Sequence, residues 1–274
     1  MAELSASQVM ALRKKTGLPM MECKQALTAS SGDEAAAIEW LKEKHKGKME
    51  TRSDRETGEG RIGVYISDDG TQGGIVELRC ETAPVGKNEM FVSLADSLAE
   101  YVAKGSESAP DAQSVHAANE AAMTEVYGKL RETMNIGLCR KLTGDALAAY
   151  VHHDGKSAAM ISMAGKPTND EVGKHTAMHA TFHKPVAVNR DGVPADKLKE
   201  IRDEAVADAK ASGKPEGVID KIADGKVDAY CSEIVMLEQE HARSDVYGKK
   251  KVKDVLKEHG VTDVTDMVLV VVGA

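Results

Sequence analysis

The sequence is poor in the features that several classes of function require. Only 3% of its 274 residues are aromatic, so it offers few rings on which the bases of single-stranded nucleic acid could stack. Its net charge of −8 argues against a general affinity for the nucleic-acid backbone. The longest apolar run, from Met267 to Val272, is far too short to span a membrane. We therefore predict no direct binding to nucleic acid and no membrane attachment.

Cysteine usage and the N-terminal residues both bear on the cellular compartment. The chain has no C-x-x-C pair, and its four cysteines are scattered at Cys23, Cys80, Cys139 and Cys231. This pattern is typical of reduced thiols in a cytosolic protein rather than of a disulfide framework. The first residues show neither the apolar core of a signal peptide nor the arginine-rich character of a transit peptide. These observations predict a cytoplasmic protein.

Motifs for catalysis and cofactor binding are also missing. No Walker loop, paired-carboxylate signature or nucleophile elbow occurs in the sequence. Residues 58–63 match G-x-G-x-x-G by letter, but a polar segment precedes them and a strand follows. The dinucleotide-binding motif needs a strand before it and a helix after it, so we reject this match. We predict a protein that acts by contact with a partner, without a cofactor, and not an enzyme.

Three histidines four residues apart, His175, His179 and His183, would share one stripe of a helix. Imidazoles at this spacing can bind zinc. However, Val172 and Phe182 lie on or beside the same stripe, and the glutamate of H-E-x-x-H is absent. The pattern therefore favours partly buried, hydrogen-bonded histidines, and we predict no metal site. His152 and His153 beside a turn aspartate resemble acid–base groups, although hairpin turns commonly hold such residues.

Residues 1–46 predict a compact unit of three helices. Ser5 followed by Gln8 is a capping-box signature for the first helix, and Asp33 is placed to cap the third. Trp40 is expected in the small core of this unit. Residues 47–59 are polar and are interpreted as a linker.

Met20 and Met21 stand where the chain turns between the first two helices. Two interpretations remain open for these residues. They either fill gaps in the core or are exposed as an adaptable contact surface.

The rest of the chain predicts an α+β fold in which one arrangement occurs twice. Residues 60–143 begin with a hairpin, 62–66 and 74–80, which leads through a loop to a helix capped by Asn88. Residues 144–260 repeat the hairpin at 148–152 and 157–163, with a helix beginning near residue 169. We predict two related α+β subdomains with antiparallel sheets.

Two further segments are distinctive. Residues 194–237 predict an antiparallel helical hairpin with Pro194 at the first helical position. This hairpin is either a protrusion or a packed surface element. Residues 261–274 are predicted to hold a buried strand.

Two segments strongly resemble one family. Residues 9–27, followed by Gly32-Asp33 and residues 37–41, resemble the N-terminal ubiquitin-associated-like domain of bacterial elongation factor Ts. Further on, Glu81-Thr82, Val85, residues 87–89 and Phe91 are similar to the family's Glu-Thr-Asp-Phe-Val-Ala-Lys-Asn motif. Weaker matches follow in the family's order along essentially the whole chain.

The resemblance implies a guanine-nucleotide exchange factor that binds elongation factor Tu in its GDP form. It implies that Leu12, Met20 and Met21 anchor the N-terminal domain on the partner. The motif loop would supply a second contact, through Thr82, Ala83, Pro84 and Val85. The second subdomain would supply a third, through His152. In the family the helical hairpin sometimes mediates dimerisation, so a homodimer through residues 194–237 is also implied.

The motif loop departs from the family at two positions, where Ala83 and Pro84 replace Asp-Phe. In the family this aromatic residue wedges between partner helices near the magnesium site, which loosens GDP. Loss of a buried aromatic anchor costs on the order of 2 kcal/mol or more. Two hypotheses follow: an active exchange factor, or a protein that binds elongation factor Tu with weak or lost exchange activity. A second departure is Glu240-His241, where Pro-Phe is usual.

Overall fold

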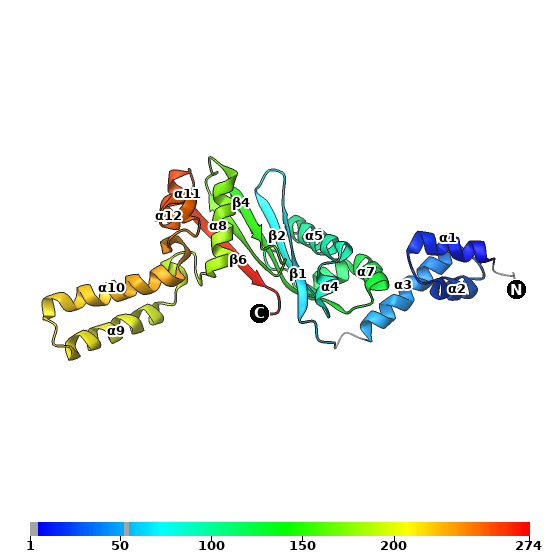
Figure 1. The fold of residues 1–274 in the computed structure, drawn as a ribbon, viewed down its shortest axis with the longest axis horizontal. Helices are drawn as coiled ribbons and strands as arrows, with labels where there is room; N and C mark the ends of the chain where they lie inside the picture. The colour runs from blue at the N-terminus through cyan, green and yellow to red at the C-terminus, as the bar shows by residue number, and fades with distance from the viewer. Residues whose placement is uncertain (1–4, 52–54) are drawn as a thin grey trace. The chain divides into compact units, whose positions relative to one another are not determined.

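The computed structural model describes residues 5–51 and 55–274 (Figure 1). Helices and two three-stranded sheets make up the fold, which confirms the predicted α+β class. The chain forms two compact units. The first contains residues from 1–65, 74–140 and 271–274, and the second contains residues 66–73 and 141–270. Among the described residues, no helix is both long and apolar enough to cross a membrane.

The N-terminal part of the first unit consists of three helices, α1 (Ala6–Thr16), α2 (Met20–Ala29) and α3 (Glu34–Glu50). The Ser5–Gln8 capping box is present, and the Asp33 carboxylate accepts a hydrogen bond from the Ala36 amide at 2.7 Å, as predicted. Both caps satisfy amides that a helix N-terminus otherwise leaves unpaired. The apolar faces of the helices meet in one small core, formed by Val9, Leu12, Leu18, Cys23, Ala26, Leu27, Ala37 and Leu41.

Two predictions for this region are wrong. Trp40 is only half-buried, with the Lys44 ammonium group 4.7 Å from its ring centroid, so it lies at the edge of the core. Residues 47–50 of the predicted linker are helical, because α3 continues to Glu50. Met49 explains the longer helix, since its side chain is buried in the core of the following sheet and helices. Residues 52–54 of the predicted linker lie outside the described residues.

The remainder of the first unit is a sheet of order β1-β2-β3, formed by β1 (Glu59–Ile66), β2 (Gln72–Cys80) and β3 (Met134–Thr143). The hairpin is followed by α4 (Ala83–Gly86), α5 (Glu89–Lys104), α6 (Ala112–Ala118) and α7 (Glu120–Leu130). Asn88 caps α5 as predicted, through a hydrogen bond from the Met90 amide. A Cβ at Gly63 or Gly74 would lie 2.1 Å from a backbone oxygen of α5, so only glycine allows this close packing of helix and sheet.

The second unit holds β4 (Ala146–Val151), β5 (Ser157–Ala164) and β6 (Asp263–Val271) in the order β4-β5-β6. β4 and β5 are antiparallel, with Ala146 opposite Met163. Helix α8 (Asp170–His183) begins where the sequence predicted a helix, is capped by Asn169, and packs on this sheet. The prediction of a fully buried last strand is wrong, because only one face of β6 is buried.

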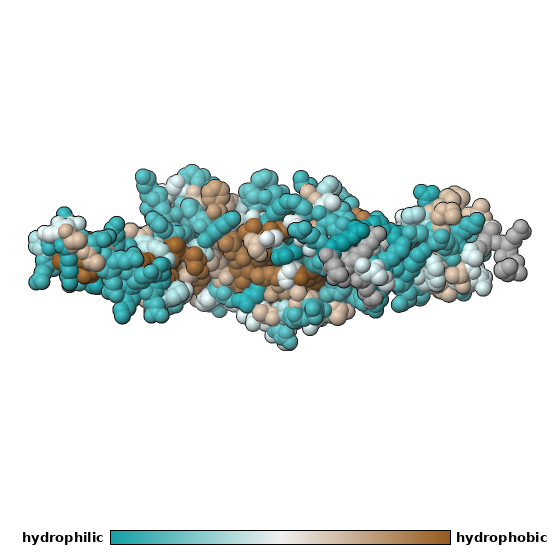
Figure 2. Space-filling model, turned by 90° about the horizontal axis from the view of Figure 1, so that it is seen from below, coloured by the Kyte–Doolittle hydropathy of each residue, from teal (hydrophilic) through white to brown (hydrophobic). Residues whose placement is uncertain are grey.

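Helices α9 (Ala195–Ala211) and α10 (Glu216–Ile234) lie side by side as the predicted hairpin (Figure 1). Pro194 immediately precedes α9 as its N-cap and does not occupy the first helical position. Figure 2 shows that much of the visible surface of this hairpin is hydrophilic. The chain then passes through η2 (Met236–Glu238), α11 (Ser244–Tyr247) and α12 (Val252–Glu258) to β6.

Candidate partner-binding site

The loop between β2 and α5 presents a short helix with an exposed tip. Thr82 is extended, with φ −134° and ψ 149°, and α4 begins at the next residue. Thr82 and Pro84 are exposed, whereas Ala83 and Val85 are half-buried. Val85 packs against the core of the first unit, which holds the far side of α4. Of the four predicted contact residues in this loop, Pro84 and Thr82 therefore offer the most surface to a partner.

Two carboxylates hold the base of this loop. The Glu132 carboxylate accepts hydrogen bonds from the Thr82 hydroxyl at 2.5 Å and from the Thr82 amide at 3.0 Å. The Glu81 carboxylate accepts a hydrogen bond from the Thr133 amide at 2.8 Å, and this bond lowers the pKa of Glu81 below its ordinary value. Glu81 and Thr82, which follow β2, thus bind Thr133 and Glu132, which precede β3. The sequence did not reveal this pairing, because Glu132 lies fifty positions from Thr82.

Cys80 lies beneath the loop and is a packing residue. Its thiol is buried and donates a hydrogen bond to the Thr82 carbonyl at 3.3 Å. Burial, followed by the nearby charge of Glu132, raises the pKa of Cys80 to about 11. The thiol is therefore protonated at neutral pH and is not a nucleophile.

In the N-terminal helices, the structure separates the three predicted anchor residues. Met20 and Met21 are 46% and 65% exposed, so the interpretation that both fill the core is wrong. Leu12 is 0% exposed and lies in the core of these helices. It therefore presents no surface to a partner in this conformation, and its part in binding would be to support the helices that carry the methionines.

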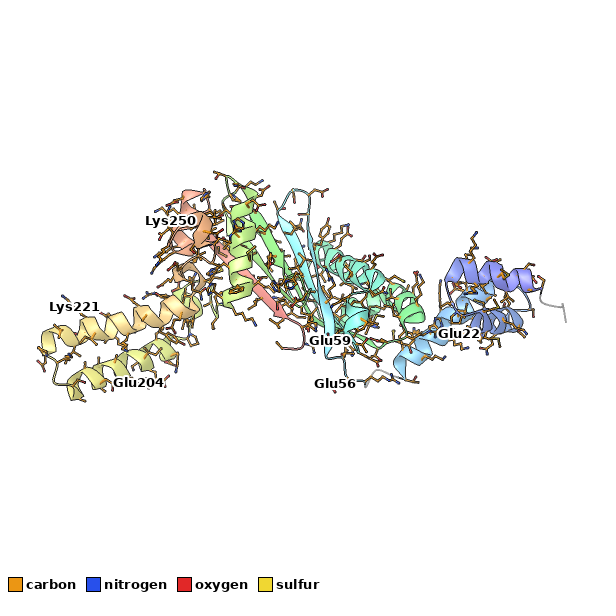
Figure 3. The ribbon with its side chains drawn as sticks, in the orientation of Figure 1. Glu22, Glu56, Glu59, Glu204, Lys221 and Lys250 are labelled. Carbon is orange, nitrogen blue, oxygen red and sulfur yellow. The ribbon has the colours of Figure 1, made fainter. Side chains whose placement is uncertain are left out.

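A partly buried polar contact joins these helices to the C-terminal end of α7. Glu22 of α2, labelled in Figure 3, accepts hydrogen bonds from Arg131 at 2.5 Å and shares one with the His45 ring at 3.1 Å. Burial alone would raise the pKa of Glu22, but these hydrogen bonds lower it below its ordinary value. His45 is buried beside Gly128, where an added Cβ would lie 2.6 Å from the ring nitrogen Nδ1. Gly128 therefore allows α3, which carries His45, to approach α7 closely.

His152 lies at the end of β4 in the second unit and is half-buried. Its Nδ1 is 3.3 Å from the Tyr150 hydroxyl, and its ring centroid is 4.2 Å from that of His153. The neighbouring Asp154 accepts a hydrogen bond from the Lys156 amide, as residues of a hairpin turn commonly do. These contacts favour a turn with an accessible imidazole over an acid–base site.

The histidine stripe of α8 is buried and hydrogen-bonded at two of its three positions. His175 lies between the Tyr247 hydroxyl at 2.8 Å and the Arg243 guanidinium at 3.0 Å. His179 accepts a hydrogen bond from the Ala242 amide at 3.1 Å and lies 2.9 Å from the Gln239 side-chain oxygen. Over the ranges 5–51 and 55–274, no group of three or more His, Cys, Asp or Glu residues is arranged to hold a metal ion.

Comparisons with known proteins agree with the resemblance noted in the sequence. The family model described as Elongation factor TS matches residues 81–274. The chain is 39% identical to Elongation factor Ts of Bordetella petrii over 278 residues, covering 100% of this chain and 92% of the relative. It is 37% identical to Elongation factor Ts of Azoarcus sp. over the same length and coverage. It is also 36% identical to Elongation factor Ts of Thiobacillus denitrificans, over 96% of this chain and 91% of the relative.

Proposed function

The chain belongs to the elongation factor Ts family, and from this premise we propose that it binds elongation factor Tu and promotes the release of GDP. It is a translation elongation factor by family, and it would act by contact rather than by covalent catalysis. The observation that carries the proposal is the exposed tip of α4 on a fixed base, within a chain that matches the family along its length. We expect this activity in the cytoplasm.

The proposed mechanism uses separate contacts for binding and for exchange. Met20 and Met21 would anchor the N-terminal helices on the partner, and His152 would add a contact from the second unit. Pro84 would then enter the partner near its phosphate and magnesium site. Because the proline ring fixes φ and the loop is already ordered, little conformational entropy is lost on insertion.

Exchange also sets a thermodynamic condition. A protein that loosens GDP must bind the nucleotide-free partner more tightly than the GDP-bound partner. The ratio of these two affinities equals the factor by which the protein lowers the partner's affinity for GDP. The distortion by α4 would provide this difference, because it opposes the phosphate and magnesium contacts that GDP requires.

Stopped-flow measurement of GDP release tests the proposal. We expect release from cognate elongation factor Tu to accelerate with rising concentration of this protein and to reach a plateau. Equal release rates with and without saturating protein would refute the proposed activity.

Ala83 and Pro84 support a second candidate, a protein that binds elongation factor Tu with weak exchange activity. Neither residue supplies the charge or the aromatic bulk of Asp-Phe. The double substitution Ala83→Asp with Pro84→Phe tests this candidate, since Pro84 is exposed and leaves room for a larger ring. A sharp rise in the maximal GDP release rate would favour the weak-exchange candidate. An unchanged rate would show that the partner already accommodates this loop.

The oligomeric state is a separate proposal. We expect any homodimer to form through α9 and α10, because these helices form the hairpin that sometimes mediates dimerisation in the family that the chain resembles. Sedimentation equilibrium would show the dimer directly, and a concentration-independent monomer mass would exclude it.

A further inference from the structure

We infer that Glu132 is a positioning residue for exchange, because it holds Thr82 and so sets the direction in which α4 projects. This inference rests on the proposed function, since it assigns a role to a residue outside the predicted contact surface. Glu132 itself would touch neither elongation factor Tu nor the nucleotide.

The location of Glu132 suits this role. It follows Arg131, the C-cap residue of α7, which adopts a left-handed conformation with φ +63°, and it precedes β3. The turn directs the Glu132 carboxylate toward the residue that leaves β2. Both carboxylate oxygens are used there, one by the Thr82 hydroxyl and the other by the Thr82 amide. Hydrogen bonds to a charged acceptor are stronger than neutral ones.

Thr82 lies at the N-cap of α4 but does not cap it through its side chain. Within the part of the chain that the structure describes, no hydrogen bond from an α4 amide to the Thr82 hydroxyl is present. The hydroxyl donates to Glu132 instead. A helix of four residues is not stable alone, and α4 has lost the local cap that usually fixes a helix start. Its orientation therefore depends on what holds Thr82 at one end, namely the Glu132 carboxylate and the Cys80 thiol, and on the packing of Val85 at the other.

The Glu81–Thr133 hydrogen bond makes the base of the loop rigid from the opposite side. Glu81 also pairs with Arg55 at 3.0 Å. Glu81, however, precedes the loop and fixes only the end of β2, whereas Glu132 reaches the first residue of the loop itself. Removing the Glu132 charge should therefore release α4 while leaving the sheet intact.

The main variant is Glu132→Gln, which preserves shape but leaves one oxygen and places an amide against the second Thr82 donor. Thr82→Val removes the hydroxyl alone, and Thr82→Ser retains it. The matched control is Glu125→Gln, which removes the same charge from an exposed residue of α7 that pairs only locally with Lys129. All variants should melt at about the wild-type temperature, because Thr82 and Glu125 are exposed and Glu132 is only half-buried.

Two readouts test the inference. In the free protein, hydrogen–deuterium exchange of the amides of residues 82–88 should be about tenfold faster in Glu132→Gln and unchanged in Glu125→Gln. In GDP release from elongation factor Tu, Glu132→Gln and Thr82→Val should each lower the maximal rate about tenfold. The half-saturating concentration should change less, because the methionine contact remains. Thr82→Ser should restore most of the rate.

The double variant Thr82→Val with Glu132→Gln should be little slower than either single variant, since both break the same contact. The positioning role would be overturned if the rate reductions of the two single variants multiplied in the double variant. It would also be overturned if the amides of residues 82–88 exchanged at the wild-type rate in Glu132→Gln. Failure of the proposed function is distinguishable, because it appears as absent acceleration by the wild-type protein. The amide-exchange result does not depend on the partner at all.

Discussion

Two buried histidines show how strongly the surroundings of a residue control its chemistry. His241 is 1% exposed, and its Nδ1 accepts a hydrogen bond from the Arg243 amide at 3.1 Å. The proton of the neutral ring therefore sits on Nε2, which is buried without a hydrogen-bond partner among the described residues. His179 stacks on it with ring centroids 5.5 Å apart. Burial, chiefly, lowers the pKa of each histidine from 6.5 to about 4.

These pKa values predict that the second unit loses stability on acidification. The folded-state pKa lies below the ordinary value, so the unfolded chain binds a proton first as the pH falls. The stabilisation is complete above pH 6.5 and is lost as the pH approaches 4, by on the order of 3 kcal/mol per histidine. Free energies of opening from hydrogen exchange of α8 amides at several pH values would measure this loss. A stability that does not change over this range would contradict the prediction.

The variant His241→Phe removes one of the two histidines that take up a proton on unfolding, so the contribution of His241 can be measured separately. The variant removes a buried Nε2 without a partner, although it also leaves the Arg243 amide unpaired, so we expect little net change at pH 7. Between pH 6.5 and 4 the dependence of stability on pH should become shallower by about 1.4 kcal/mol per pH unit. His153→Gln serves as the control, because it removes an imidazole from an exposed turn position.

At the scale of elements, the three N-terminal helices divide supporting residues from contact residues. Leu12 points into a core of only eight buried side chains, whereas Met21 at the start of α2 is mostly exposed. The two side chains are similar in size and apolarity, yet their positions assign them different roles. A small core has little reserve stability, so the loss of one leucine is felt by all three helices.

Leu12→Ala and Met21→Ala should therefore weaken binding to elongation factor Tu for different reasons. We expect Leu12→Ala to cost about 2 to 5 kcal/mol and to unfold α1–α3 locally. Met21→Ala should leave helicity unchanged and reduce affinity about tenfold. Circular dichroism with titration calorimetry separates the two effects. Met10 is also an exposed methionine, with 62% of its surface accessible, so Met10→Ala is the control for a general loss of apolar surface.

At the scale of the molecule, the proposed contacts are distributed over two units. Met21 belongs to the first unit and His152 to the second. One chain would thus hold its partner through independent surfaces, so that binding at one raises the effective concentration of the other.

This arrangement predicts additivity. Met21→Ala and His152→Ala should each reduce affinity about three- to tenfold, and the double variant should show the product of the two factors. Independent sites add because neither substitution alters the surroundings of the other. Titration calorimetry measures all three affinities. If the double variant were no weaker than one of the single variants, the two residues would not be separate contacts.

The sequence alone predicted the features that act over a few residues. Ser5, Asp33 and Asn88 cap helices through amides two or three positions away, so their effect is visible in the local pattern. Hairpins, helix stripes and the α+β class follow from periodicity in the same way. The family resemblance then supplied the expected partner and the predicted contact residues.

The tertiary structure alone decided the features that depend on distant residues. Met49 extends α3 because a core formed by later segments buries it, and Glu132 fixes a loop fifty positions earlier. Burial also separated Leu12 from Met21, which the family resemblance groups together as anchors. Periodicity shows which residues share a face, but only the packed chain determines what covers that face. For this reason the sequence could predict a contact loop, and only the fold could show what holds that loop in place.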